Sequence, residues 1–157
     1  MITCTFIGRG HKLDPRIMPV LQKELEQLIR SGDDFTFCSR SYSEFEKACE
    51  QIIFDIKARY RHRKQPADKA IDLLSINPIR EHYSDDSEPY TREEREKMET
   101  GIFPLSKEEK ALRWTIDQSD VVITYVLDPY DDDYDALMYA KSKEGLRIIR
   151  IDPPPSL

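Results

Sequence analysis

Residues 3–15 read TCTFIGRGHKLDP, a short apolar run that leads through two glycines and three basic side chains to a proline. Apolar, β-branched and aromatic residues bounded by glycine are typical of a buried strand, here residues 2–7. Asp14 can cap the helix that follows, with Pro15 at its first position, where a missing N–H costs nothing. The stretch therefore predicts a strand–turn–helix unit whose turn offers glycines and cations to an anionic ligand.

The same alternation of strand and helix signals continues along the chain. Short runs rich in β-branched and aromatic residues predict further strands at residues 35–38, 70–76, 121–127 and 146–151. Between them, apolar residues recur at helical spacing behind capping pairs such as Ser43 and Glu46. Residues 77–105 lack such a pattern, and we expect an irregular excursion there with one short helix near residues 92–99.

This order of elements predicts the fold class. About five strands alternating with helices favour an α/β fold, a Rossmann-like doubly wound parallel sheet with flanking helices, in a single domain over residues 1–157. The runs at residues 2–7 and 121–127 are nearly pure apolar, as strands covered on both faces must be. We therefore expect these two strands to be adjacent at the centre of the sheet.

Composition excludes several classes of protein. Of the 157 residues, 39% are hydrophobic and 34% are charged, and no apolar run approaches the roughly 18 residues of a membrane span, so no membrane partner is expected. Cys4, Cys38 and Cys49 are an odd set without CxxC spacing, which favours reduced thiols in a cytoplasmic protein without a secretion signal. A net charge of −6 argues against nucleic acid as a partner, and the basic run at residues 57–64 is interpreted as a solvated helix end.

Three loops define the candidate site. In a doubly wound sheet, ligands bind beyond the carboxyl ends of the strands, near the point where the strand order reverses. The loops at residues 8–12, 39–43 and 128–133 are therefore expected to meet there. The first two supply glycines, hydroxyls and cations, which suit a phosphate or carboxylate, although a tight turn with solvated basic side chains is the alternative. The candidate ligand-binding residues are Gly8, Arg9, Gly10, His11, Lys12, Ser39, Arg40 and Ser41, with Arg40 as the expected anchor.

The third loop carries carboxylates instead. Its sequence, DPYDDDYDA at residues 128–136, contains five aspartates and no glycine. Hard cations prefer several oxygen ligands, which makes Asp128, Asp131, Asp132 and Asp133 candidates for a divalent-metal site. The spacing matches no EF-hand loop, and a solvated loop with one capping aspartate is the favoured interpretation. We therefore predict no metal and no cofactor, and we expect an anion over the first two loops rather than over this one.

Four motifs resemble those of the SLOG superfamily and, within it, the small YpsA-like bacterial proteins. CTFIGRGHKL is similar to the family's strand ending in Phe-x-Gly-His-Arg, and FCSRSYSEFEKAC resembles a branch pattern of the type Phe-Gly-Ser-x-Ser-x-Phe-Asp. RWTIDQSDVVITYV is similar to Arg-x-x-Met-Ile-Asp-x-Ser-Asp before the central strand, and DALMYAKSKEGLRIIRI resembles the Tyr-Ala-Lys-Lys helix with its closing strand. The resemblance covers most of the chain and implies a Rossmann-like fold with a pocket for a nucleotide or nucleotide-derived ligand.

The chain departs from the family pattern at its phosphate loops. Where the family carries Ser-Gly-Thr or Gly-Gly-Thr, residues 128–136 have no glycine, and Cys38 and Ser39 stand where Gly-Ser is expected. The motif of the related LOG enzymes, which hydrolyse the N-glycosidic bond of nucleoside monophosphates, is absent. The leading hypothesis is a cytoplasmic protein that binds a nucleotide-like or other anionic small molecule, with catalysis left open. The alternatives are a degenerate, non-catalytic member that acts through a protein partner or as a homo-oligomer, and an N-glycosidic bond hydrolase.

Overall fold

A parallel β-sheet forms the centre of the computed structural model, which describes residues 2–8, 12–31, 34–40, 43–62, 71–75, 91–101, 105 and 107–153. Its strands pair in the order β3-β2-β1-β4-β5, and every pair is parallel. The α/β class with a parallel sheet is therefore confirmed, as is the central position of the first strand beside the one that begins at Val121. The strands are β1 (Ile2–Ile7), β2 (Phe35–Ser39), β3 (Ile71–Ser75), β4 (Val121–Thr124) and β5 (Arg147–Arg150).

Strand β4 is shorter than its apolar run predicts, because it ends at Thr124 and not at residue 127. The Tyr125 N–H still donates to the Ile7 carbonyl at 2.8 Å, but β1 ends there, so the ladder has no further partner on that side. Tyr125 and Val126 remain buried, and they pack into the cores on opposite faces of the sheet. The apolar run therefore continues because the core needs it, beyond the point where the strand ends.

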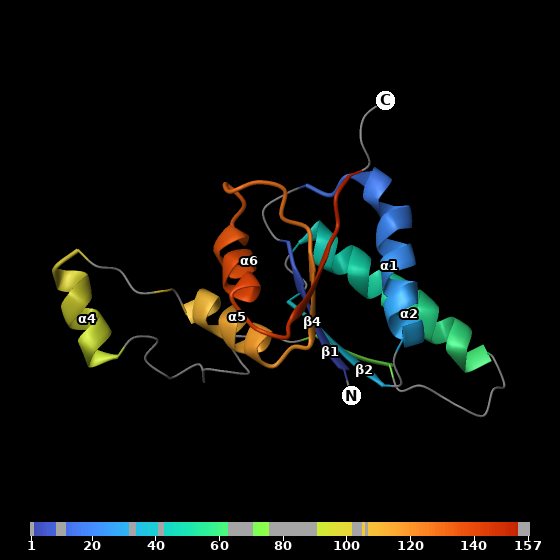
Figure 1. Ribbon diagram of the computed structural model, residues 1–157, viewed down its shortest axis with the longest axis horizontal. Coiled ribbons are helices and arrows are strands. Elements are labelled where there is room, and N and C mark those ends of the chain that lie inside the picture. The colour runs from blue at the N-terminus through green and yellow to red at the C-terminus, as the bar shows by residue number, and fades with distance from the viewer. Residues whose placement is uncertain are drawn as a thin grey trace.

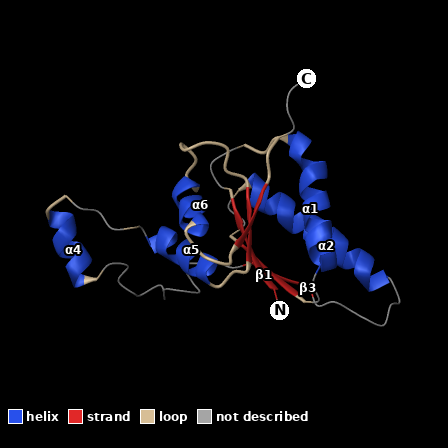
Figure 2. Cartoon of the chain, in the orientation of Figure 1, coloured by secondary structure: helices blue, strands red, loops and turns tan. Residues whose placement is uncertain are grey.

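Helices cover both faces of this sheet (Figures 1 and 2). A short 3-10 turn (Pro15–Ile17), α1 (Met18–Ser31) and α2 (Glu44–His62) lie on one face, and α5 (Lys107–Asp117) and α6 (Tyr134–Lys141) lie on the other. Each face has its own core: Leu21, Leu25 and Ile53 are fully buried on the first, and Leu112 and Leu137 pack on the second. This is the three-layer arrangement that a parallel sheet requires when both of its faces are apolar.

The expected helix caps are present. The Asp14 carboxylate accepts a hydrogen bond from the Arg16 N–H at 2.9 Å, directly before Pro15 at the first helical position. Ser43 and Glu46 form the predicted capping box, with the Ser43 hydroxyl accepting from the Glu46 N–H at 3.1 Å and the Glu46 carboxylate accepting from the Ser43 N–H at 3.2 Å. Local sequence signals therefore place the starts of the helices that face the candidate site.

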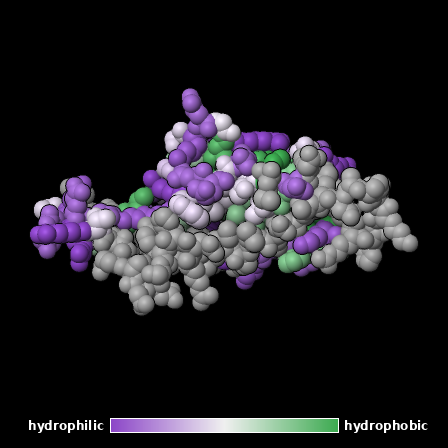
Figure 3. Space-filling model, turned by 90° about the horizontal axis from the view of Figure 1, so that it is seen from below, coloured by the Kyte–Doolittle hydropathy of each residue, from purple (hydrophilic) through white to green (hydrophobic). Residues whose placement is uncertain are grey.

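Helix α4 (Arg92–Glu99) is the short helix expected inside the excursion, and it stands apart from the sheet (Figure 1). None of its residues is buried, and its surface is hydrophilic (Figure 3). Thr91 and Glu94 form its capping box, and Lys110 of α5 donates to Glu94 at 2.6 Å. Residues 76–90 lie outside the described residues. Within the described parts of the chain, no helix combines the length and apolar character needed to cross a membrane.

Cys4, Cys38 and Cys49 are free and buried, as the sequence predicts. Burial raises the pKa of the Cys4 and Cys49 thiols well above the ordinary value. A thiol that stays protonated is a poor nucleophile and a poor metal ligand. These cysteines therefore serve as small core residues.

Candidate functional site

The candidate site lies at the carboxyl edge of the sheet, which is the edge where the parallel strands end. Strands β1 and β4 are adjacent, whereas β2 and β3 extend the sheet on one side and β5 extends it on the other. The chain leaves β1 toward α1 on one face and leaves β4 toward α6 on the opposite face (Figure 1). The two connections therefore diverge between β1 and β4, which is the switch point where ligands bind in open α/β sheets.

Arg40, the expected anion anchor, lies directly after β2 and is already bound to carboxylates of its own chain. Its Nε lies 2.7 Å from Glu46 Oε1, and its Nη2 lies 2.7 Å from Asp133 Oδ2. The side chain of Arg40 is only 8% exposed, and those of Glu46 and Asp133 are 0% and 3% exposed. We call these three residues the Arg40 cluster.

Two carboxylates, those of Glu46 and Asp133, contact the guanidinium of Arg40. Burial alone would lower the pKa of Arg40, but the charges of Asp133 and Glu46 and their hydrogen bonds raise it above the ordinary value. The guanidinium therefore stays charged. Burying such a group is expensive unless partners surround it, and here both arms of its fork are occupied.

Asp133 joins the ends of two strands to the start of α6. Besides holding Arg40, its Oδ2 accepts a hydrogen bond from the backbone N–H of Gly8 at 3.1 Å. Gly8 follows β1, Arg40 follows β2, and Asp133 immediately precedes α6. One carboxylate therefore receives a backbone amide and a guanidinium from two different loops, which is the donor set that a phosphate or carboxylate ligand would need.

Gly8 has no room for a side chain. A Cβ at this position would lie 2.8 Å from Cδ1 of Phe45 and 2.9 Å from the carbonyl oxygen of Tyr125. Phe45 is the second residue of α2 and is fully buried, and Tyr125 is the first residue after β4. The glycine is therefore required here for close packing between three elements.

Residues 12–14, which lie before the 3-10 turn and α1, are held by hydrogen bonds to side chains of other elements. The hydroxyl of Tyr125 accepts from the Asp14 N–H at 3.2 Å and donates to the Lys12 carbonyl at 3.4 Å. The carboxylate of Glu44, at the start of α2, accepts from the Leu13 N–H at 2.9 Å. Asp133 therefore holds the start of the connection from β1 to α1 at Gly8, and Tyr125 and Glu44 hold its end at residues 12–14.

The structure brings together some of the sequence-predicted site residues. Gly8 and Arg40 meet through Asp133, whereas Lys12 is exposed and Ser39 is buried at the end of β2. Arg9, Gly10, His11 and Ser41 lie outside the described residues.

A small pocket with room for about one water molecule lies beside Arg40. It is lined by Thr5, Phe6, Cys38, Ser39, Arg40, Leu112 and Thr115.

In the loop at residues 128–133, aspartate side chains accept hydrogen bonds from backbone N–H groups of the same loop, as capping aspartates do. Oδ1 of Asp128 accepts from the Tyr130 N–H at 2.8 Å, and Oδ1 of Asp131 accepts from the Asp133 N–H at 2.8 Å. Asp132 is exposed. In the part of the chain that the structure describes, no group of three or more histidine, cysteine or acidic side chains is placed to hold a metal ion.

Sequence reasoning missed the role of Asp133. The sequence predicts solvated or capping aspartates in this loop, which would repel an anion, and no local pattern links one of them to Arg40. The signal available was Arg40 itself, because an arginine that directly follows a largely apolar strand needs a carboxylate partner if it is buried. That argument predicts a partner but does not choose among the acidic residues of the chain.

Comparison with known proteins adds no family to this geometry. The chain matches no protein-family model and no curated protein. The resemblance to the SLOG superfamily therefore stays a prediction from the four sequence motifs.

Proposed function

We propose that this protein binds a small molecule with an anionic group, nucleotide-like in kind, at the switch point between β1 and β4. The observation that carries the proposal is that the Gly8 N–H and the Arg40 guanidinium converge on one carboxylate oxygen, at 3.1 and 2.7 Å. A backbone amide beside an arginine fork is a common way to hold a phosphate or carboxylate. Its position at the carboxyl edge of a parallel sheet is where ligands of this class bind.

The burial of the Arg40 cluster also supports a binding role. Its three charged side chains are at most 8% exposed, and a buried ion pair of this kind often contributes no more to stability than apolar residues of the same volume would. Buried charges that break the pattern of an apolar core are typical of functional sites. No chemical step is proposed, because the described residues assign no nucleophile or general base.

A second candidate function is binding to a protein partner. In this case the chain no longer binds a small-molecule ligand at the carboxyl edge. The observation in its favour is that both arms of Arg40 already hold carboxylates of the same chain. In that case the Arg40 cluster is purely structural, and it fixes the start of α2 and of α6 against the sheet. The two candidates differ in one measurable property, since only the first requires an anion to bind at this edge.

The first test is a thermal-shift screen of the wild-type protein with inorganic phosphate, AMP and ADP-ribose, with and without a chelator. We expect at least one of these anions to raise the melting temperature, with the effect unchanged in chelator. Calorimetry then compares wild type with Arg40→Lys, which keeps the charge that balances Glu46 and Asp133 but loses the fork. We expect the affinity to fall by about tenfold, within the range of one charge-assisted hydrogen bond.

Arg113→Lys is the matched control, because Arg113 lies on α5 and contacts the ring of Tyr139, not the carboxyl edge. Its affinity for the anion should equal that of wild type. Failure of every anion at millimolar concentration contradicts the proposal and leaves the protein-partner candidate. An anion that binds equally well to wild type and Arg40→Lys places the site elsewhere.

A further inference from the structure

We propose that the carboxylate of Asp133 occupies the place of the ligand's anionic group, so that the ligand binds only when Asp133 leaves. This inference rests on the function proposed above and adds the regulation of the same site. The structure then represents a closed state, in which the chain supplies its own anion to Gly8 and Arg40.

The contacts of Asp133 are those of a bound anion. Its Oδ2 accepts from the Gly8 N–H at 3.1 Å and from Nη2 of Arg40 at 2.7 Å, and its Oδ1 lies 3.5 Å from Nη1 of the same guanidinium. This approaches the two-pronged geometry in which arginine binds phosphates as well as carboxylates. An incoming phosphate would therefore compete with Asp133 for the same N–H groups.

Two carboxylates contact Arg40, those of Glu46 and Asp133. Only the Asp133 side chain can move away from Arg40 without disturbing the helix that it precedes. Glu46 also accepts from the Ser43 N–H at 3.2 Å as part of the capping box of α2, so its movement would uncap that helix. Asp133 is the N-cap residue of α6, yet its side chain makes no capping hydrogen bond to that helix. The first turn of α6 therefore does not depend on where the Asp133 side chain points.

The loop that carries Asp133 is held by other groups. Asp128 binds the Tyr130 N–H and Asp131 binds the Asp133 N–H, both at 2.8 Å, and neither bond uses the Asp133 carboxylate. The first amides of α6 lack partners within the helix and offer the displaced carboxylate a second set of donors. To reach them, Asp133 would turn its backbone from φ −98° and ψ 10° toward the extended values of a capping residue.

The consequence is a reduced affinity in the wild-type protein. When only a fraction of the molecules is open, the observed dissociation constant is larger than that of the open state by the inverse of this fraction. Removing the negative charge of Asp133 should therefore increase the affinity for an anion. A similar loss of charge at a neighbouring residue that does not contact Arg40 should leave it unchanged.

The experiment measures the affinity of inorganic phosphate and of AMP for wild type and two variants, by following the backbone amide resonance of Gly8. Asp133→Asn keeps the shape of the side chain and removes its charge. Asp132→Asn is the matched control, because Asp132 is the exposed neighbour. We expect affinity to rise about tenfold in Asp133→Asn, as for an open fraction of about one tenth, and to change less than twofold in Asp132→Asn.

Each outcome decides between the inference and the proposed function. Binding to wild type with no gain in Asp133→Asn overturns the inference and leaves the proposed function standing. An equal gain in Asp133→Asn and in Asp132→Asn also overturns it, because the effect would then be one of net charge. Absence of binding to wild type and to Asp133→Asn overturns both.

A second measurement requires no variant. In wild type, saturation with phosphate should shift the side-chain carboxyl carbon of Asp133 together with the Gly8 amide, because both lose their hydrogen bond to each other. A Gly8 shift without any response from the Asp133 carboxyl overturns the inference even if Asp133→Asn fails to fold.

Discussion

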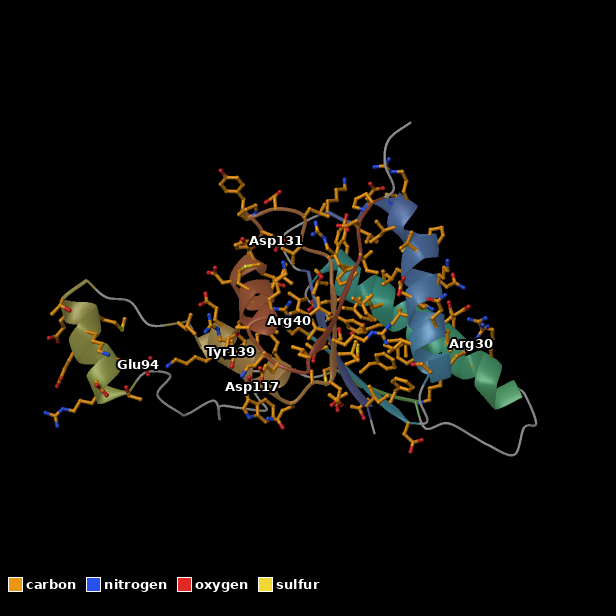
Figure 4. The ribbon with its side chains drawn as sticks, in the orientation of Figure 1. Arg30, Arg40, Glu94, Asp117, Asp131 and Tyr139 are labelled. Atoms are coloured by element: carbon orange, nitrogen blue, oxygen red, sulfur yellow. The ribbon has the colours of Figure 1, made fainter. Side chains whose placement is uncertain are left out.

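Two clusters of charged side chains lie at different places in the fold, and they differ in burial. The Arg40 cluster lies at the carboxyl edge with side chains that are at most 8% exposed. The second, which we call the Tyr139 cluster, consists of Arg113, Asp117, Tyr139 and Lys143 on α5, α6 and the residues after α6. Its ion pair, Lys143 with Asp117 at 2.5 Å, has side chains that are 37% and 36% exposed. In Figure 4, Arg40 is labelled between α6 and the sheet, whereas Asp117 and Tyr139 are labelled toward the other end of α6.

Bond lengths alone do not distinguish the two clusters. The Tyr139 hydroxyl donates to Asp117 at 2.6 Å, and Arg40 lies 2.7 Å from each of its carboxylates. In the Tyr139 cluster, water can replace any partner that is removed, so each contact contributes little. In the Arg40 cluster the side chains are at most 8% exposed, so removal of one group leaves a buried charge. Burial, more than distance, therefore decides how much a charged contact contributes to stability.

The largest expected effect is that of Arg40→Ala. This change removes the guanidinium that the buried carboxylates of Glu46 and Asp133 both contact, and we expect a loss of about 3–5 kcal/mol in the free energy of unfolding. Urea denaturation followed by circular dichroism measures the loss. Arg113→Ala, from the Tyr139 cluster, is the control, with an expected loss of about 0.5–1 kcal/mol for the cation–π contact between two partly exposed side chains. Equal losses in the two variants would remove the contrast between the clusters.

Gly8→Ala comes second. The added Cβ would lie 2.8 Å from Cδ1 of Phe45 and 2.9 Å from the Tyr125 carbonyl oxygen, and neither a fully buried ring nor a backbone atom can move away easily. We expect a loss of about 2 kcal/mol or more, as for overpacking in a core. Gly145→Ala is the control for backbone strain alone, since its φ is +77° and no atom lies within 4 Å of its added Cβ. A Gly8→Ala protein as stable as wild type would show that β1, α2 and the residue after β4 are less closely packed than described.

The central strands and the start of α2 show how far the sequence alone predicts the fold. The apolar runs at residues 2–7 and 121–127 predict adjacent central strands because a strand covered on both faces has to be apolar on both sides. The capping pair Ser43 and Glu46 predicts the start of α2 because its signal lies within four residues. The end of β4 at Thr124 was not predictable in this way, since it depends on where the neighbouring strand ends.

The candidate site was predicted less well for the same reason. The carboxyl edge follows from the order of strands and helices, and it correctly brings the residues after β1 and β2 near each other. The pairing of Arg40 with Asp133 joins residues that are 93 positions apart, and no local pattern encodes such a contact. The aspartates of residues 128–135 were therefore treated alike, although two of them cap turns and one holds Arg40.

A smaller effect is expected from Tyr125→Phe, which keeps the ring and removes the hydroxyl bonded to Lys12 and Asp14. We expect a loss of about 1 kcal/mol, the typical net contribution of hydrogen bonds of this kind. Hydrogen exchange at the Asp14 amide should become faster at the same time, because this amide loses its acceptor. Tyr130→Phe is the control, since Tyr130 is 94% exposed, and both its stability and its exchange rates should match wild type. Unchanged exchange at Asp14 in Tyr125→Phe would contradict the prediction.

The smallest effect is expected in the Tyr139 cluster itself, from Asp117→Asn, and it should depend on pH. Partial burial would raise the pKa of Asp117, but the hydrogen bonds from Lys143 and Tyr139 outweigh this and lower that pKa below its ordinary value. A carboxylate with a lowered pKa stabilises the fold above its unfolded-state pKa of about 3.9, and this contribution is lost as the pH falls through the folded-state pKa.

We therefore expect Asp117→Asn to lose about 0.5 kcal/mol at pH 7, a figure reduced for the exposure of the pair, and progressively less as the solution is made more acidic. Urea denaturation of wild type and variant at a series of pH values from neutral to acid measures both features. Asp152→Asn, which removes an even more exposed partner of Arg150, serves as the control. A loss of about 2 kcal/mol or more at pH 7 would put this exposed cluster in the energetic class of buried pairs. The difference in burial would then not explain any difference in stability contribution between this cluster and the Arg40 cluster.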